Sequence, residues 1–171
     1  MSSAVLFTDH MIDRPGRALP RFPVSLEKRI ATRIADELEA AHATDGFASA
    51  ACGGDLLFLE AMMARDGRVH VTLPCAVEAF REDCADIIPG GDWGTRFDHI
   101  LKSAHSVEIL GDEYASDNAI ASECCNRVMV GLTERCARSK GEEPVVIALW
   151  DGRPGGCGGR GNTFHHPVLL A

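Results

Sequence analysis

The sequence predicts an α/β protein with a three-layer Rossmann-like fold and a mostly parallel sheet. Short apolar segments, typical of buried strands, alternate along the chain with longer segments of helical periodicity. This alternation favours parallel strands that are joined by right-handed crossovers. Glycine-rich turns follow two of the expected strands. A length of 171 residues, without an internal repeat or a linker-like stretch, fits a single domain that covers residues 1–171.

Five segments have the composition of strands. "SAVLFT" and "PVVIALW" are apolar runs expected of buried strands, and "RVHVTLP" alternates between apolar and polar residues. The expected strands are residues 3–8, 47–51, 68–74, 106–110 and 144–150.

Five segments have the composition of helices. The first follows an expected N-cap at Ser25, carries an apolar residue at every fourth position and ends before Gly46. A second stripe of the same spacing predicts a long helix near the C-terminus, and it consists of Ile120, Cys124, Val128, Leu132 and Cys136. The expected helices are residues 26–45, 55–65, 77–85, 93–104 and 117–139.

The composition argues against several functions. The chain has 25 acidic and 17 basic residues and a formal net charge of −8, which is unfavourable for binding a nucleic acid backbone. Its seven cysteines form no C-x-x-C pair, and no Cys₂His₂ spacing appears, so we expect no disulfide framework, no metal and no other cofactor. The N-terminus lacks a signal-peptide pattern, and no apolar run approaches the roughly 20 residues that span a bilayer. We therefore expect a cytoplasmic protein that contacts neither nucleic acid nor membrane.

Two glycines and an aspartate separate an expected strand from an expected helix. These residues are Gly53, Gly54 and Asp55. Glycine lets backbone N–H groups approach a phosphate, and a helix N-terminus favours an anion. The motif matches neither the G-x-G-x-x-G pattern nor the P-loop pattern. It predicts either a phosphate-facing turn or a tight structural turn in which Asp55 caps the helix.

A second glycine-rich segment follows the last expected strand. It begins after Asp151, is rich in glycine over residues 152–161 and continues into Asn162 and Thr163. Both glycine turns should lie at the carboxyl edge of the parallel sheet, where open α/β sheets bind ligands. Together they predict a phosphate or ribose site, and the alternative is a loop without function. Its expected contacts are Gly53, Gly54, Asp55, Asp151, Gly158, Gly159, Gly161 and Thr163.

The segment 9–23 follows the first strand, so it too is expected at this edge. Arginine suits phosphate because its planar guanidinium group makes paired, charge-assisted hydrogen bonds. Three prolines favour a fixed loop shape, and the alternative is a charged surface loop. The candidate ligand contacts in the loop are Asp9, His10, Arg14, Arg17 and Arg21. The loop also contains Asp13.

Glu60 is a carboxylate on an otherwise apolar predicted helix, so it either reaches solvent or lies in a cleft with a partner. In a cleft its pKa would rise, and the group could act on a ribose or on a leaving base. Trp93 and Phe97 are expected in the core, Asp92 as an N-cap, and Arg96 within reach of a phosphate.

The stretches "ACGGDLLFLEAMMARDGRVHVTLP" and "VVIALWDGRPGGCGGRGNT" resemble the SLOG superfamily, which includes the LOG-type phosphoribohydrolases and the Smf/DprA proteins. The chain looks most similar to the sensor-type domains that accompany tetratricopeptide repeats or nucleotide cyclases in bacterial signalling proteins. The likeness covers most of the chain, and its motifs are moderately specific. It implies a Rossmann-like fold that binds a nucleotide or a nucleotide-derived ligand and then changes its contacts with a partner protein or with its own copies.

One departure from the family pattern concerns catalysis. The LOG enzymes hold phosphate with a P-G-G-x-G-T-x-x-E stretch whose glutamate serves the reaction. In the aligned residues 158–165, Asn162 replaces the threonine and His165 replaces the glutamate. Histidine lacks the negative charge that stabilises a developing oxocarbenium ion, so the resemblance favours binding over hydrolysis. The alternative is a nucleoside-monophosphate N-glycosidase or a nucleoside deoxyribosyltransferase-like enzyme with Glu60 as the catalytic carboxylate.

Overall fold

The computed structural model describes residues 2–112, 118–151 and 168–170. Strands and helices alternate along the chain, as the sequence predicts. The elements are β1 (Ser3–Thr8), η1 (Val24–Leu26), α1 (Glu27–Ala40), β2 (Ala43–Ala48), α2 (Gly54–Ala64), β3 (Arg68–Leu73), α3 (Val77–Phe80), the π-helical turn η2 (Arg81–Ala85), α4 (Trp93–Ser103), β4 (Ser106–Ile109), α5 (Asn118–Ser139), β5 (Val145–Trp150) and β6 (Val168–Leu170).

The described strands form one sheet in the order β4-β3-β2-β1-β5-β6. Each neighbouring pair is parallel. The prediction of an α/β fold with a parallel sheet is therefore confirmed. The three-residue strand β6, which is too short for a periodicity to reveal, was not among the predicted strands.

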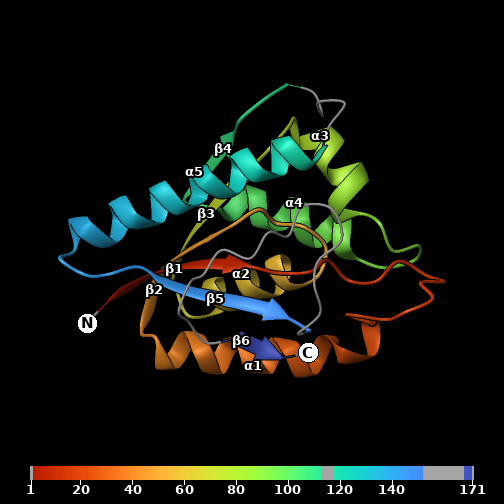
Figure 1. The fold of residues 1–171 in the computed structure, drawn as a ribbon, viewed down its shortest axis with the longest axis horizontal. Coiled ribbons are helices and arrows are strands. Elements are labelled where there is room, and N and C mark those ends of the chain that lie inside the picture. The colour runs from red at the N-terminus through yellow and green to blue at the C-terminus, as the bar shows by residue number, and fades with distance from the viewer. Residues whose placement is uncertain (1, 113–117, 152–167, 171) are drawn as a thin grey trace.

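The order in which the chain adds strands to the sheet reverses between β4 and β5, so β2, β3 and β4 lie on one side of β1 and β5 lies on the other. From β1 the chain proceeds through β2 and β3 to β4 at one edge, and α5 then carries it back to β5 on the other side of β1. In Figure 1, α5 crosses the upper part of the view and α1 runs along the lower margin, with β1 and β5 between them. At such a reversal the connections that leave two neighbouring strands run to opposite faces of the sheet, and α/β sheets typically bind ligands between them, at the carboxyl ends of the strands.

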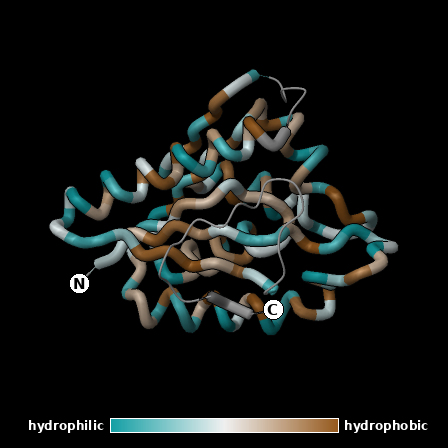
Figure 2. The backbone as a smooth tube through the Cα atoms, in the orientation of Figure 1, coloured by the Kyte–Doolittle hydropathy of each residue, from teal (hydrophilic) through white to brown (hydrophobic). Residues whose placement is uncertain are grey.

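Side chains of β1, β2 and β5 enter two hydrophobic cores, one on each face of the sheet. Phe7 of β1 joins residues of α1, α2 and α4 such as Ile34, Leu56 and Phe97 in the larger core. Leu6, the neighbouring residue of β1, belongs to the smaller core, which lies under α5. Figure 2 shows the apolar residues gathered along the central strands. The fold therefore has three layers, with α1, α2 and α4 on one face of the sheet and α5 on the other.

The boundaries predicted for α1 were wrong at both ends. Ser25 does not cap the helix, because it lies inside η1, and no side chain caps α1. The helix ends at Ala40, well before Gly46, and His42 then adopts a positive φ of 50°. The chain therefore turns out of the helix earlier than the position of Gly46 suggested.

The strand predicted at 47–51 is β2, which begins at Ala43 and ends at Ala48. The prediction missed its first half because Asp45 and Gly46 are typical of turns. Gly46 is needed there for packing, since a Cβ would lie 2.7 Å from Cγ of Met62 and 2.9 Å from Cζ of Phe58. Asp45 is buried and is neutralised by cations from other elements, which local sequence does not reveal.

The apolar stripe predicted for α5 is displaced by one residue. Cys125, Met129 and Ala137 are buried against the sheet. Of the predicted stripe, Leu132 and Cys136 pack at the margin of this core, whereas Ile120 is 61% exposed. The helix thus carries a second apolar row that does not face the sheet.

Other expectations for the core are confirmed. Trp93 and Phe97 are buried in the larger core.

The six cysteines in the described part of the chain are free thiols, and burial raises the pKa of Cys52 to about 12 and that of Cys125 to about 11. None of the helices within residues 2–112 and 118–151 combines the length and apolar composition needed to cross a lipid bilayer.

Candidate functional site

The candidate site lies where the carboxyl ends of β1, β2 and β5 come together. Asp9 and His10 follow β1, Asp151 follows β5, and the turn from β2 leads to Gly53. Because β1 pairs with both β2 and β5, these segments are neighbours at one edge of the sheet. The structure therefore brings together most of the predicted site residues that it describes.

Gly53 lies against the chain's own loop. The N–H of Ile12 donates a hydrogen bond to the carbonyl of Cys52 (2.9 Å), and Met11 forms a bridge with Gly53. Gly53 has a φ of 119°, and a Cβ at this position would lie 2.6 Å from the backbone nitrogen of Ile12. The close approach that glycine permits here is that of residues 11–12, and ligand contact at Gly53 stays a prediction.

Gly54 and Asp55 receive the side chain of Asp9. One oxygen, Oδ2 of Asp9, accepts the N–H of Asp55 at 3.0 Å. A Cβ on Gly54 would lie 2.3 Å from the same oxygen, so glycine is required for the carboxyl group to fit. The first turn of α2, which the sequence suggested as a phosphate site, thus already binds a carboxyl group of this chain.

Asp9 and Asp55 form a pair of neighbouring acids. Asp55 is buried, and its Oδ2 accepts the N–H of Ala51 at 3.1 Å, so it folds back onto the preceding turn instead of acting as the N-cap, which is Gly53. Burial raises the pKa of both groups, and the charge of Asp55 raises that of Asp9 further. Backbone N–H groups oppose these shifts without cancelling them. The pair therefore holds protons to a higher pH than ordinary aspartates do.

Arg21 links the loop to the end of β5. Its Nε and Nη2 donate to the two oxygens of Asp151 at 2.8 and 2.7 Å. Nη2 also lies 3.0 Å from Nε2 of His10. Since arginine only donates, Nε2 of His10 is the acceptor and the proton of the neutral ring is on Nδ1. Burial lowers the pKa of His10, and the charge of Arg21 lowers it further, so the ring stays neutral at neutral pH.

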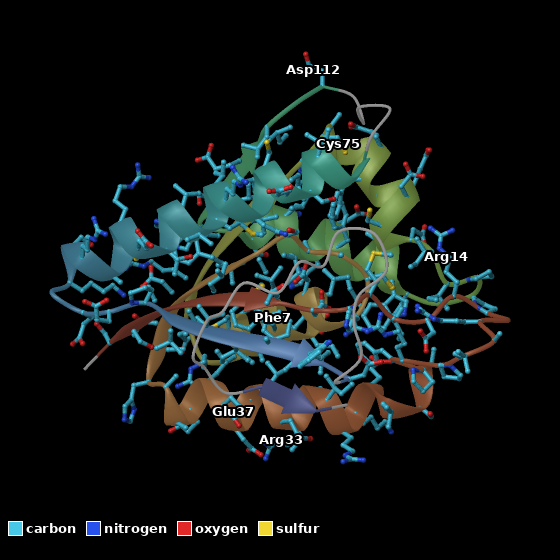
Figure 3. The ribbon with its side chains drawn as sticks, viewed as in Figure 1. Phe7, Arg14, Arg33, Glu37, Cys75 and Asp112 are labelled. Atoms are coloured by element: carbon cyan, nitrogen blue, oxygen red, sulfur yellow. The ribbon has the colours of Figure 1, made fainter. Side chains whose placement is uncertain are left out.

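The other two candidate arginines also bind acceptors of this chain. Arg17 Nη1 lies 3.2 Å from Oδ1 of Asp13, and Arg14 donates to the carbonyl of Asp83 at 3.0 Å. In Figure 3, Arg14 lies at the periphery, far from Phe7 at the centre of the view. Arg21 thus lies beside the ends of β1 and β5, whereas the partner of Arg14 lies in η2 and that of Arg17 lies in the loop 9–23.

Asp13 fixes the shape of the loop, a role that the sequence did not reveal. It is buried, and its Oδ2 accepts the N–H groups of Arg21 (2.8 Å) and Phe22 (2.9 Å). Phe22 itself is buried in the larger core. An aspartate followed by turn residues was the available signal, but its partners are eight and nine residues away.

Glu60 faces α1 and α4. Nε and Nη2 of Arg96 donate to its two oxygens at 2.7 and 2.6 Å, and Nη1 of Arg96 donates to Glu27 at 2.9 Å. The guanidinium group of Arg96 also lies 4.0 Å from the ring centre of Trp93. Hydrogen bonds with Glu60 raise the pKa of Arg96. Glu60 and Arg96 thus bind each other, and the catalytic role of Glu60 stays a prediction.

The remaining candidates, Gly158, Gly159, Gly161 and Thr163, lie outside the described residues. Within the described ones, no group of three or more His, Cys, Asp or Glu side chains is arranged to hold a metal ion. No protein-family model matches the sequence, and no curated protein matches it either.

Proposed function

We propose that this chain binds a nucleotide or nucleotide-derived ligand in the crevice between the ends of β1 and β5, and that it acts as a sensor domain. One observation carries this proposal: the polar cluster His10–Arg21–Asp151 lies beside the ends of β1 and β5, where the order of the strands reverses. The side chains of Arg21 and Asp151 are 12% and 10% exposed, so the cluster is held in place before a ligand arrives. Preformed polar groups at a topological switch point are typical of ligand sites.

The charges in the described half of this crevice suit a sugar better than a phosphate. Arg21 is paired with Asp151, and Asp9 adds a carboxyl group that accepts a backbone N–H. A carboxylate such as Asp151 accepts hydrogen bonds from hydroxyl groups and repels phosphate, and a protonated carboxyl group such as Asp9 can donate to a hydroxyl group or accept from one. We therefore assign the ribose to Asp9, His10 and Asp151. The resemblance to SLOG domains supports a phosphate contact in the glycine-rich segment 158–163, as the sequence predicts.

The sensor role is favoured over the hydrolase alternative by the state of Glu60. Both of its oxygens are engaged by Arg96, and a carboxylate held in this way is not positioned to act on a ribose. Incubation with nucleoside monophosphates, followed by measurement of free base, tests the alternative. Base release that is lost in Glu60→Gln would replace the sensor role by an enzymatic one.

Calorimetric titration with AMP, cyclic AMP and ADP-ribose tests the ligand site. We expect saturable binding of at least one of these compounds and a dissociation constant about tenfold higher in Asp151→Asn, equivalent to about 1.4 kcal/mol. Asp36→Asn, on the exposed face of α1, is the matched control and should bind as the original chain does. An absence of binding, or equal weakening in both variants, would contradict the proposal.

A further inference from the structure

The outward face of α5 carries an apolar row. Ile120 is 61% exposed and Val128 is 36% exposed, with the exposed Cys124 between them. These residues recur every four positions, so they share one side of the helix. Cys125 and Met129 face the sheet instead and are buried. The row therefore has no partner from the sheet below α5.

Gly131 continues this face toward the C-terminal end of α5. Glycine weakens the interior of a helix, so its presence there calls for a reason. A Cβ at Gly131 would meet nothing within 4 Å, so packing against the described residues does not supply one. A residue without a side chain on an exposed helical face lets another backbone approach closely.

The N-terminal half of α5 packs on β3, beside β4. The thiol of Cys125 donates to the carbonyl of Thr72 (3.2 Å), and Thr72 pairs in register with Glu108 of β4. The N-terminal half of α5 and the end of β4 thus lie on the same part of the molecule.

The charges beside this row are self-complementary. Glu123 and Arg127 lie on one flank of the row, form an ion pair at 2.6 Å, and are 65% and 78% exposed. A two-fold axis near Cys124 would set two copies of α5 antiparallel, with Ile120 of one copy against Val128 of the other. Glu123 of each copy would then face Arg127 of the other copy. A surface with one charge of each sign fits its own copy, whereas an acidic or a basic partner would meet a like charge.

We propose that this face of α5, formed by Ile120, Cys124, Val128 and Gly131, is the interface of a two-fold symmetric homodimer. The proposal is independent of the ligand site, which lies at the β1–β5 crevice. It commits to a second copy of this chain as the occupant, because both the apolar row and its flanking charges are matched by their own two-fold image.

Sedimentation velocity under reducing conditions tests this interface over a range of protein concentrations. The original chain should approach twice its mass of 18.4 kDa as concentration rises. Cys124→Glu places two like charges together at the axis, and we expect a dimer dissociation constant about tenfold higher or more. Asn126→Glu makes the same change in charge at an exposed position of α5 that lies 200° around the helix from Cys124. It should leave the dimer unchanged.

Cross-linking gives a second measurement that does not depend on a destabilising substitution. A short bismaleimide, which adds to two thiols, should link two copies of the original chain and fail to link Cys124→Ser. A monomer at every concentration would overturn the proposal. A dimer that Cys124→Glu and Asn126→Glu weaken equally would also overturn it, because its interface would then not be this face of α5.

Discussion

Two groups of buried and half-buried acids lie at opposite edges of the same sheet, and they are stabilised in different ways. Asp45 lies near the start of β2, at the amino edge. Asp9 and Asp55 follow the ends of β1 and β2, at the carboxyl edge. Asp45 is surrounded by cations, whereas Asp9 and Asp55 accept hydrogen bonds from backbone N–H groups and lie beside each other.

The group around Asp45 fastens three elements together. Arg68 donates to both oxygens of Asp45 at 2.8 and 3.0 Å, His70 lies 3.2 Å away, and Lys140, just beyond α5, also binds it. Burial alone would raise the pKa of Asp45, but these hydrogen bonds outweigh burial and hold the pKa well below its ordinary value. Nδ1 of His70 is 2.9 Å from Ser106, which extends the network to β4.

The acids at the two edges differ in what pairs with them. At the amino edge, the carboxylate of Asp45 forms ion pairs with Arg68 and Lys140, so the network serves stability. At the carboxyl edge, burial raises the pKa values of Asp9 and Asp55, and their hydrogen bonds come from backbone N–H groups instead of cations. Acids kept in such a costly state are typical of functional sites.

Replacing Asp45 by Asn should destabilise the protein most. The variant removes the negative charge that pairs with Arg68 and Lys140 and turns one acceptor oxygen into an N–H donor, which is expected to lower the free energy of unfolding by about 3 kcal/mol. Urea denaturation at pH 7 measures the change. Glu39→Gln removes the partner of Arg65 at a position whose side chain is 78% exposed, and it should have little effect. Equal changes in the two variants would remove the special role of the amino edge.

Replacing Gly54 by Ala should disrupt the carboxyl edge. The new methyl group would displace the carboxyl group of Asp9 from the first turn of α2, and we expect a loss of about 2 kcal/mol. Thermal and urea denaturation measure it. Gly131→Ala, where a Cβ meets open space, should instead increase the stability of the monomer by about 1 kcal/mol. A neutral Gly54→Ala would show that Asp9 does not depend on this glycine.

The acid pair should make the protein less stable as pH rises from about 5 to 8. The unfolded chain releases these protons near pH 4, whereas the folded chain keeps them to a higher pH because the pKa values are raised. Over this window the folded state binds more protons, so the free energy of unfolding falls as pH rises. Asp55→Asn should reduce this fall by about 1 kcal/mol, measured by urea denaturation at several pH values. A fall of the same size in both proteins would contradict the raised pKa values.

Local sequence was sufficient where an element's own residues decide its structure. "SAVLFT" and "PVVIALW" became β1 and β5, and the spacing of Ile30, Ile34 and Leu38 placed the buried side of α1 correctly. The expectation that the segments after β1, β2 and β5 meet at one edge followed from the parallel connections alone.

Tertiary structure decided which groups bind each other. The sequence suggested that Gly53 and Gly54 make room for a ligand, but the backbone of Ile12 and the carboxyl group of Asp9 occupy the space beside them. It suggested three arginines for phosphate, and the fold paired Arg21 with Asp151 across 130 residues.

Composition and periodicity therefore determined the class of fold and the edge at which a ligand should bind, because hydrophobic burial and chain connection act through local patterns. The partners of Asp45, Asp9 and Arg21 were decided only when distant segments packed together. Hydrogen bonds and ion pairs depend on distances of a few ångströms between groups far apart in the chain, and no local pattern fixes those distances.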